Sequence, residues 1–168
     1  MVSVGQSLMT QKILDELKKC GITHIVWLPH SENKAMYEAV SREPSITLVP
    51  ICREGEAVPI ALGLWLGGGN PAIMHQSTGF YDAGDSVRGL ALDYQLPLLM
   101  LIGARGWRKS PPPTDSAATF LEPVLDAWGI KHYLVAGEKE IPKISQAYQE
   151  TQATSRPVAV LIAEEQVQ

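Results

Sequence analysis

Cysteine is scarce in this sequence, with only Cys20 and Cys52 among 168 residues. Two cysteines at this irregular spacing exclude a disulfide framework and a cysteine-based zinc site. The four histidines show no ligand spacing such as HExxH, so we do not expect a metal that is bound wholly by this chain. The sequence also lacks a GxxxxGKS/T phosphate loop, and the absence of a GxSxG nucleophile elbow removes the simplest hydrolase interpretation.

Long hydrophobic runs and an excess of positive charge are also missing. No apolar run approaches the roughly 18 residues that a membrane helix needs, and the first residues, MVSVGQSLMTQK, lack the basic-then-apolar pattern of a signal peptide. The formal net charge of −4 gives no reason to expect a nucleic-acid partner. Charged residues make up only 19% of the chain, which hints that other subunits cover part of the surface. We therefore expect a soluble, cytoplasmic protein.

Short apolar runs alternate with helical patterns along the chain. Continuous apolar strands of this kind are typical of an open parallel sheet with helices on both faces. Because the sequence has no repeat, linker or low-complexity tract, we predict a single α/β domain of about six strands over residues 1–168. The predicted strands are Ile22–Leu28, Ile46–Ile51, Ala72–His75, Leu96–Ile102, His132–Val135 and Pro157–Ile162. The predicted helices are Gln6–Cys20, Glu32–Ser41, Glu54–Leu66, Asp85–Tyr94, Asp115–Trp128 and Glu138–Ala153.

The turns that follow the strands are the places to search for a site, because ligands of such sheets bind outside the carboxyl ends of the strands. Four turns meet this criterion: His30-Ser31, Cys52–Glu56, Gln76–Phe80 and Gly103–Lys109. The glycine run at residues 67–69 does not meet it, since it follows a helix and precedes a strand. We interpret that run as a helix end and not as a dinucleotide-binding loop.

The turn at Cys52–Glu56 is followed by a helix that has almost no polar residue. Apolar side chains of residues 58–66 surround the helix axis instead of forming one stripe, which is typical of a helix buried on all sides. A helix that flanks a single sheet usually keeps a solvated face, so we expect this one to meet another subunit. Residue types alone leave two interpretations of Glu54 and Glu56 open. Either both acids are ordinary helix-start residues, which interact favourably with the helix dipole, or one of them binds a ligand.

Three segments of the sequence resemble the pyrimidine-binding domain of thiamine diphosphate enzymes. They are ICREGEAVPIALGLWLGGGNPAIMHQSTGF, LPLLMLIGARGW and RPVAVLI, and they follow one another in the family's order between Ile51 and Ile162. Within the family, the sequence is most similar to the alpha subunits of sulfopyruvate decarboxylases and to the related phosphonopyruvate decarboxylases. The most specific element is the glutamate just after the second strand, followed by Gly, then Ala and an apolar helix.

The resemblance implies separate roles for the two acids. Glu54 matches the catalytic glutamate that hydrogen-bonds N1′ of the cofactor's aminopyrimidine and so promotes removal of the thiazolium C2 proton. The cofactor then accepts the electrons that remain when carbon dioxide leaves a 2-oxo acid. Glu56 is left as a helix-start or interface residue.

The turn after the third strand matches a segment that often reads Gln-Asn-Ser-Gly in the family and lines its active site. The match implies that Gln76, Thr78 and Gly79 bind the cofactor and that Ser77 binds the substrate. Simple turn chemistry is the alternative for Thr78.

His30 and Ser31 stand where these decarboxylases often carry Pro-Asp-Ser near the substrate. The sequence here reads Pro-His-Ser, and the exchange of Asp for His leaves the substrate open. His30 could act as a proton donor or bind an anionic group, or it could face solvent as a turn residue. Arg105, with Arg108 and Lys109 on the same loop, could bind a sulfonate or phosphonate head group. Solvated surface charge is the alternative.

These enzymes also need a diphosphate-binding domain with a Gly-Asp-Gly segment and a following Asn. This chain has only Gly84-Asp85-Ser86, in the wrong setting, and 168 residues are too few for a second domain. The resemblance therefore implies a separate beta subunit that carries the diphosphate-binding domain, holds most of the Mg²⁺ coordination and shares the active site.

The leading hypothesis is the alpha subunit of a thiamine-diphosphate-dependent decarboxylase that converts 3-sulfopyruvate to sulfoacetaldehyde and carbon dioxide. Phosphonopyruvate or another 2-oxo acid is the alternative substrate. Two further classes stay open at this point: a non-catalytic interaction module with the same domain, and a flavodoxin-like nucleotide binder.

Overall fold

Six parallel strands form one sheet in the computed structural model, which describes residues 4–29, 34–107 and 113–163. The strands lie in the order β2-β1-β3-β4-β6-β5, and every neighbouring pair is parallel. The predicted α/β class with a parallel sheet is confirmed. The strands are β1 (His24–Trp27), β2 (Thr47–Pro50), β3 (Pro71–Gln76), β4 (Leu99–Gly103), β5 (Lys131–Val135) and β6 (Val158–Ile162).

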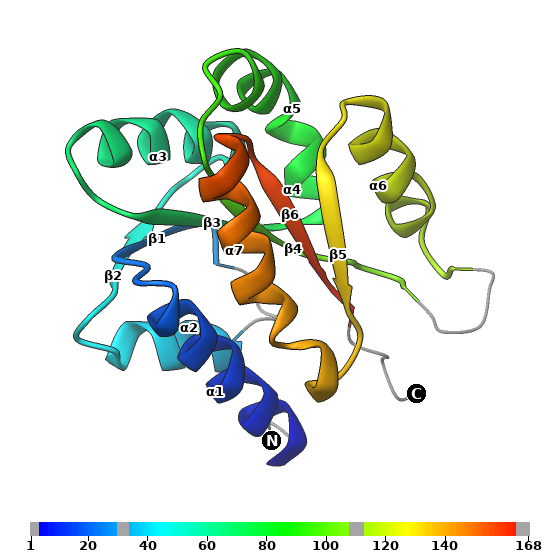
Figure 1. Cartoon of the computed structure of the whole chain (residues 1–168). Helices are drawn as coiled ribbons and strands as arrows, with labels where there is room; N and C mark the ends of the chain where they lie inside the picture. The colour runs from blue at the N-terminus through cyan, green and yellow to red at the C-terminus, as the bar shows by residue number, and fades with distance from the viewer. Residues whose placement is uncertain (1–3, 30–33, 108–112, 164–168) are drawn as a thin grey trace.

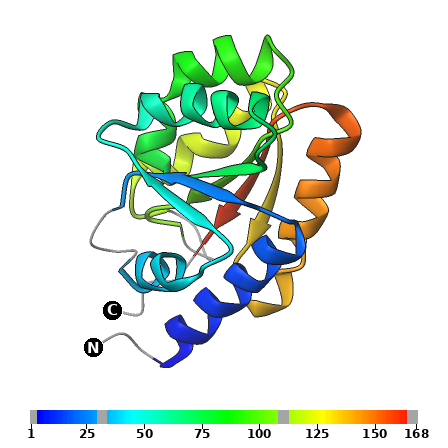
Figure 2. The same cartoon turned by 90° about the vertical axis from the view of Figure 1, so that its left-hand side faces the viewer.

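Helices cover both faces of the sheet (Figure 1), and Figure 2 shows the sheet between the two helical layers. One face packs against α1 (Val4–Lys19), α2 (Lys34–Arg42) and α7 (Lys143–Thr154). The other packs against α3 (Ala57–Leu66), α4 (Ser77–Asp82), α5 (Gly84–Ser86), the π-helical η3 (Val87–Leu92) and α6 (Ser116–Ala127). Two 3-10 turns are η2 (Glu54–Glu56) and η4 (Glu138–Glu140). In the part of the chain that the structure describes, no helix combines the length and the apolar character that crossing a membrane requires.

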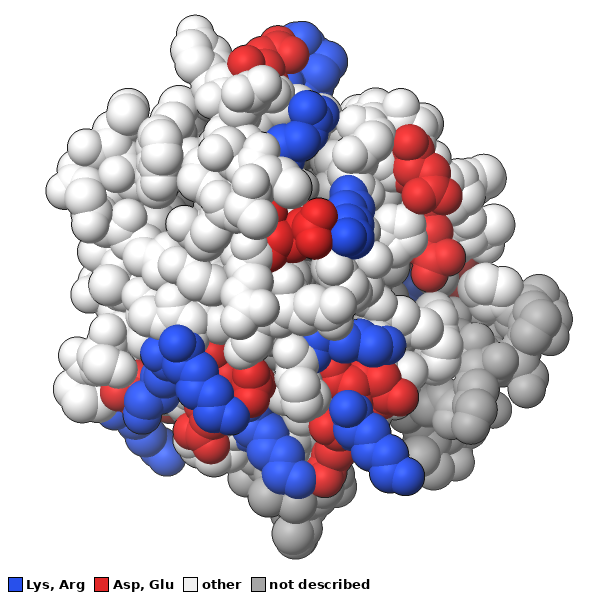
Figure 3. Space-filling model, in the orientation of Figure 1, with Lys and Arg blue, Asp and Glu red and all other residues white. Residues whose placement is uncertain are grey.

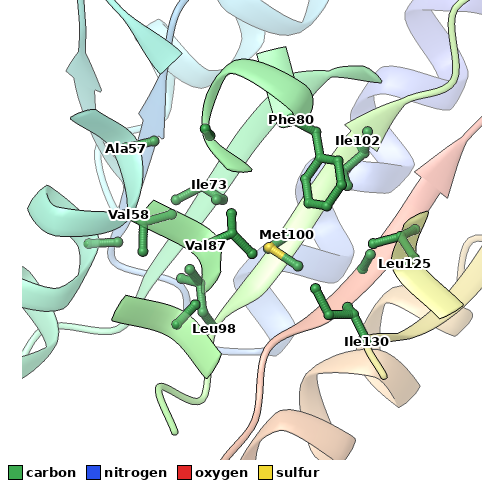
Figure 4. Packing of buried hydrophobic residues seen from close by; sticks show 14 of the residues in the cluster. Ala57, Val58, Ile73, Phe80, Val87, Leu98, Met100, Ile102, Leu125 and Ile130 are labelled. Carbon is green, nitrogen blue, oxygen red and sulfur yellow. The ribbon is translucent and has the colours of Figure 1, made fainter. Parts of the chain in front are cut away.

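Two hydrophobic cores lie on opposite faces of the sheet and are filled by alternate strand residues. On β3, Met74 belongs to the core under α1, α2 and α7, whereas Ile73 belongs to the core under α3, α4 and α6. Because both faces of the central strands β4 and β6 are buried, these strands are continuous apolar runs in the sequence. Figure 4 shows the second core, in which Ile73 and Met100 of the sheet face Val58 and Val87 of the helices.

Two of the predictions differ from the structure, one at the start of β4 and one at the end of β3. The strand expected from Leu96 begins only at Leu99, because Pro97 has no N–H to donate and Leu98 donates its N–H to the Leu96 carbonyl at 2.8 Å. The turn expected at residues 76–79 does not exist as a separate element. Gln76 instead ends β3, and the following residues form the first turn of α4, so the chain passes from strand to helix without a loop.

Helix α3 is apolar on all sides, but in this chain only one side is buried. Ala57, Val58 and Ala61 lie in the core, whereas Trp65 and Leu66 are 40% and 71% exposed. Figure 3 shows that the surface over α3 carries no charged side chain, while Lys, Arg, Asp and Glu gather mainly over α1 and α2 at the bottom of the view. The expected cover by another subunit stays a prediction.

Helix α6 allows a matched test of the second core, because it carries a buried and an exposed apolar side chain. Leu125 is fully buried, whereas Phe120 is 58% exposed. We expect Leu125→Ala to lower the free energy of unfolding by about 2–5 kcal/mol, since it removes buried methyl groups and leaves a cavity. Phe120→Ala should change it by less than about 1 kcal/mol. Urea denaturation followed by circular dichroism measures both, and equal losses would contradict this account of the core.

Candidate functional site

The candidate site lies at the carboxyl edge of the sheet, beside the point where the chain reverses direction across it. From β1 the chain moves outward to β2 and then returns to place β3 on the other side of β1. Ligands of open parallel sheets bind at such a switch point. The segments after β1, β2 and β3 therefore share this edge. The predicted residues His30 and Ser31 follow β1 but lie outside the described residues.

Glu54 is the first residue of η2, just beyond β2, and its side chain lies against Gly79 in α4. A Cβ atom placed on Gly79 would stand 2.5 Å from Glu54 Cγ and 2.8 Å from Glu54 Oε1. Real Cβ atoms do not approach a neighbour so closely, so glycine at position 79 leaves the space that the Glu54 side chain occupies. The structure thus brings together two residues that the sequence assigns to the cofactor.

Glu56 points back toward the backbone of its own turn. Its Oε2 atom accepts the N–H of Cys52 at 3.1 Å and the N–H of Arg53 at 3.3 Å. These bonds satisfy donors that the start of a helical segment leaves free. Glu56 is therefore engaged as a helix-start residue in this chain, whereas the Glu54 side chain lies against a helix of the neighbouring crossover.

Asp82, at the end of α4, bonds to the residue before Glu54 and lies beside the residue after it. Arg53 donates from Nε to Oδ2 at 3.3 Å and from Nη2 to Oδ1 at 3.5 Å, and Oδ2 would lie 3.9 Å from a Cβ atom placed on Gly55. The Arg53 hydrogen bond is the main cause that holds the pKa of Asp82 below its ordinary value. The sequence analysis misses Asp82. Its only sequence signal is its spacing of three residues from Gly79, which puts both on one face of a helix.

The first turn of α4 places its predicted residues in different surroundings. Gln76 ends β3 and stands in register with Gly103 of β4. Ser77 is fully buried, and among the described residues its hydroxyl has no hydrogen-bond partner. Thr78 is exposed and lines a groove of about 450 Å³ between α4 and α6. The structure tests none of their predicted roles, and the burial of Ser77 means that a substrate would reach its hydroxyl only after α4 shifts.

Arg105 lies on the segment that leaves β4, near the same groove. Its Nε atom is 3.1 Å from Oδ2 of Asp115, which lines the groove and caps α6 by accepting the Ala117 N–H at 2.9 Å. An anion that bound Arg105 would therefore share this guanidinium with Asp115. Arg108 and Lys109, predicted on the same loop, lie outside the described residues.

His75 is a buried imidazole beneath this edge that the sequence analysis does not single out. It is 3% exposed, and neither ring nitrogen has a hydrogen-bond partner among the described residues. Burial lowers the pKa of His75 to about 4, and the attraction of the Asp82 carboxylate offsets this only in part. The ring is therefore neutral at neutral pH. A polar residue near the end of an apolar strand is its only sequence signal.

The close contact between Glu54 and Gly79 predicts that one methyl group added at position 79 destabilises the fold. We expect Gly79→Ala to lower the free energy of unfolding by about 1–3 kcal/mol, because the new Cβ forces the Glu54 side chain or α4 to move. Gly89→Ala is the matched control, since nothing lies within 4 Å of a Cβ there. It should be neutral or stabilise the chain by about 0.4–1 kcal/mol. Chemical denaturation compares the two, and equal effects would show that the space at Gly79 is not restricted.

The buried imidazole predicts a pH dependence of stability. The unfolded chain binds a proton on His75 near pH 6.5, but the folded chain binds it only near pH 4, so the free energy of unfolding falls as pH decreases between these values. The shift corresponds to about 3 kcal/mol. We expect His75→Leu to remove a fall of this size relative to the unmodified chain, whereas His132→Gln, at a partly exposed position on β5, should not. Urea denaturation at pH 4.5, 5.5 and 7 measures the difference, and an unchanged fall in His75→Leu would contradict it.

The family model described as "Thiamine pyrophosphate enzyme, N-terminal TPP binding domain" matches residues 9–116, a range that includes Glu54, Gly79 and Asp82. The sulfopyruvate decarboxylase subunit alpha of Methanocaldococcus jannaschii is 29% identical over 151 residues, which are 89% of each chain. The sulfopyruvate decarboxylase of Methanosarcina acetivorans is 25% identical over 91% of this chain, but the match spans only 39% of that relative.

A solved structure gives the same picture of the fold. Benzoylformate decarboxylase from Polynucleobacter necessarius superposes with a TM-score of 0.70 over 92% of this chain, at 21% sequence identity. The match spans 29% of that longer chain, and an identity this low supports the fold alone. The match to the family model and the match to this solved decarboxylase structure indicate the same fold. This chain therefore belongs to the family of N-terminal TPP binding domains of thiamine pyrophosphate enzymes.

Proposed function

We propose that this chain is the alpha subunit of a thiamine-diphosphate-dependent 2-oxo-acid decarboxylase, in which Glu54 activates the cofactor's aminopyrimidine. The observation that carries the proposal is the position of the Glu54 side chain, at the ligand edge of the sheet and against a glycine that leaves room for it. The family membership supports the cofactor. The match over 89% of an alpha subunit supports the subunit role.

The residues at the carboxyl edge fit an aminopyrimidine ring. Glu54 would hold N1′ through a hydrogen bond to its carboxyl group. Gly79 offers a surface without a side chain beside that carboxyl group, and Gln76 and Thr78 precede it in the chain, at the end of β3 and the start of α4. An aspartate at position 54 would be about one methylene too short to reach the ring from η2. Thiamine diphosphate, when bound, supplies the electron sink for loss of carbon dioxide.

Glu54 acts on a proton in this proposal. Its carboxyl group would share a proton with N1′ of the ring, and this would favour a basic 4′-nitrogen. Glu56 cannot take this part, because both backbone hydrogen bonds hold it within its own turn. Exclusion of water from the pair would strengthen the hydrogen bond at N1′.

The second half of the site would come from a beta subunit. That chain would carry the diphosphate-binding domain and hold Mg²⁺ and the diphosphate group. The uncharged, exposed end of α3, with Trp65 and Leu66, is the surface that we assign to the partner, since a large apolar patch on one chain marks an interaction site. Relatives of twice this length or more, such as the Methanosarcina acetivorans enzyme, match the chain over only part of their own length.

The substrate we propose is 3-sulfopyruvate, with carbon dioxide and sulfoacetaldehyde as products. The names of the two similar methanogen proteins support it. Arg105 is the described candidate for the sulfonate, although it would share its charge with Asp115. His30, Ser31 and Ser77 complete the proposed substrate residues. Phosphonopyruvate is the alternative, and product analysis over a panel of 2-oxo acids separates the two.

Glu54→Gln tests the proposal, and Glu56→Gln, at the other acid of the same turn, is the matched control. The complex of this chain with its beta subunit, thiamine diphosphate and magnesium is mixed into D₂O, and NMR follows loss of the cofactor's C2 proton. We expect Glu54→Gln to retain part of the cofactor binding but to slow this exchange and the release of carbon dioxide by about 100-fold or more. Glu56→Gln should lower stability but leave the exchange rate within about threefold.

Two results would overturn the proposal. If the unmodified complex does not accelerate the C2 exchange over free cofactor, the chain is not part of a thiamine-dependent catalyst and serves as an interaction module. If Glu56→Gln slows the exchange as much as Glu54→Gln, the two acids are not separated in the way the geometry indicates.

A further inference from the structure

Glu54 begins a 3-10 turn of three residues that leads directly into α3, so it stands at the exposed end of that helix, next to the loop after β2. The residue before Glu54 and the residue after it both face one carboxylate, that of Asp82. Arg53 forms a two-atom fork with it, at 3.3 Å and 3.5 Å, and Asp82 Oδ2 would lie 3.9 Å from a Cβ atom placed on Gly55. A segment that one carboxylate faces on both sides of a residue has little freedom to rotate that residue.

The same helix also touches the Glu54 side chain. Gly79 and Asp82 are three positions apart on α4, so they lie on one face of the helix. The contact with Gly79 limits the positions that the Glu54 side chain can take. The interactions of Asp82 with the neighbouring residues hold the backbone beside Glu54. Helix α4 thus holds Glu54 at two points that belong to one rigid turn.

The exposure of the ion pair argues against a role in overall stability. The side chains of Arg53 and Asp82 are 73% and 40% exposed, and ion pairs this exposed contribute little to stability. Their two-atom geometry, in contrast, fixes an orientation. His75 beneath them stays neutral at neutral pH, because burial lowers its pKa to about 4, so it does not compete with Arg53 for the carboxylate.

We propose that Asp82 is the positioning residue of Glu54: it holds Arg53 and lies beside Gly55 so that the carboxyl group between them points at the aminopyrimidine. This inference rests on the proposed function, since Glu54 acts there on the cofactor. Asp82 itself touches neither cofactor nor substrate. Its loss should therefore lower the rate of the chemical step and leave substrate affinity unchanged.

The first experiment uses the chain alone and needs no cofactor. Glycine labelled with ¹⁵N reports on Gly55 and Gly79, and glutamate labelled with ¹³C at the carboxyl group reports on Glu54. We expect Asp82→Ala to shift the Gly55 amide, the Gly79 amide and the Glu54 carboxyl signals. Asp85→Asn is the control, because Asp85 also forms an exposed pair with an arginine, Arg88, at 2.8 Å on the next turn. It should leave all three signals in place.

The second experiment uses the assembled complex with thiamine diphosphate and magnesium. We expect Asp82→Ala to slow exchange of the cofactor's C2 proton and kcat by about 10- to 100-fold, in proportion to each other, because a displaced catalytic group is less effective. The KM for the 2-oxo acid should stay within about twofold. Asp82→Asn keeps the shape and one acceptor oxygen, so it should recover part of the exchange rate, and Asp85→Asn should match the unmodified complex.

The outcomes separate this inference from the proposed function. If the unmodified complex accelerates C2 exchange and Asp82→Ala does so equally well, Asp82 does not position Glu54. If the Glu54 carboxyl signal of the isolated chain is unchanged in Asp82→Ala, the inference also fails, whatever the complex does. If the unmodified complex shows no acceleration, the proposed function fails, and with it the assignment of Asp82 to catalysis.

Discussion

The close contact between the Glu54 side chain and Gly79 is the constraint on which the candidate site depends. It joins the crossover after β2 to the helix after β3, and it exists only because position 79 has no Cβ atom. The parallel sheet makes the contact possible, since the carboxyl ends of neighbouring strands open at one edge. The buried strands β1 and β3 pack closely beneath this edge, and a side chain that is to hold a ligand in a fixed orientation needs such a support.

The two acids of η2 illustrate how hydrogen bonding divides similar side chains into different roles. Glu56 satisfies two N–H groups of its own turn, and this frees Glu54 from any part in closing the turn. Asp82 and Arg53 fix the turn from the outside. The turn is therefore held by the two hydrogen bonds of Glu56 and by the ion pair between Arg53 and Asp82, and this ion pair is exposed to solvent. An exposed edge of this kind agrees with the proposed partner subunit, which would complete the site by covering it.

Sequence reasoning predicts the sheet well because burial on both faces leaves a direct trace, as in the apolar runs of β4 and β6. It places the strand that starts at Leu99 three residues too early, because apolar character alone does not register that Pro97 cannot join the ladder. It finds Glu54 by position, but residue types do not separate Glu54 from Glu56, and the family resemblance was needed. Asp82 and His75 are missed, since their surroundings come from segments far apart in the chain.

Each segment at the carboxyl edge is attached to the sheet by its own strand. The turn with Glu54 follows β2, whereas Arg105 follows β4, and a buried strand, β3, with β1 beyond it, separates the two attachment points. Substitutions in segments that share no partners have nearly additive effects on free energy. Over evolution, substitutions after β4 can therefore change the surroundings of Arg105 while the turn that carries Glu54 is inherited unchanged.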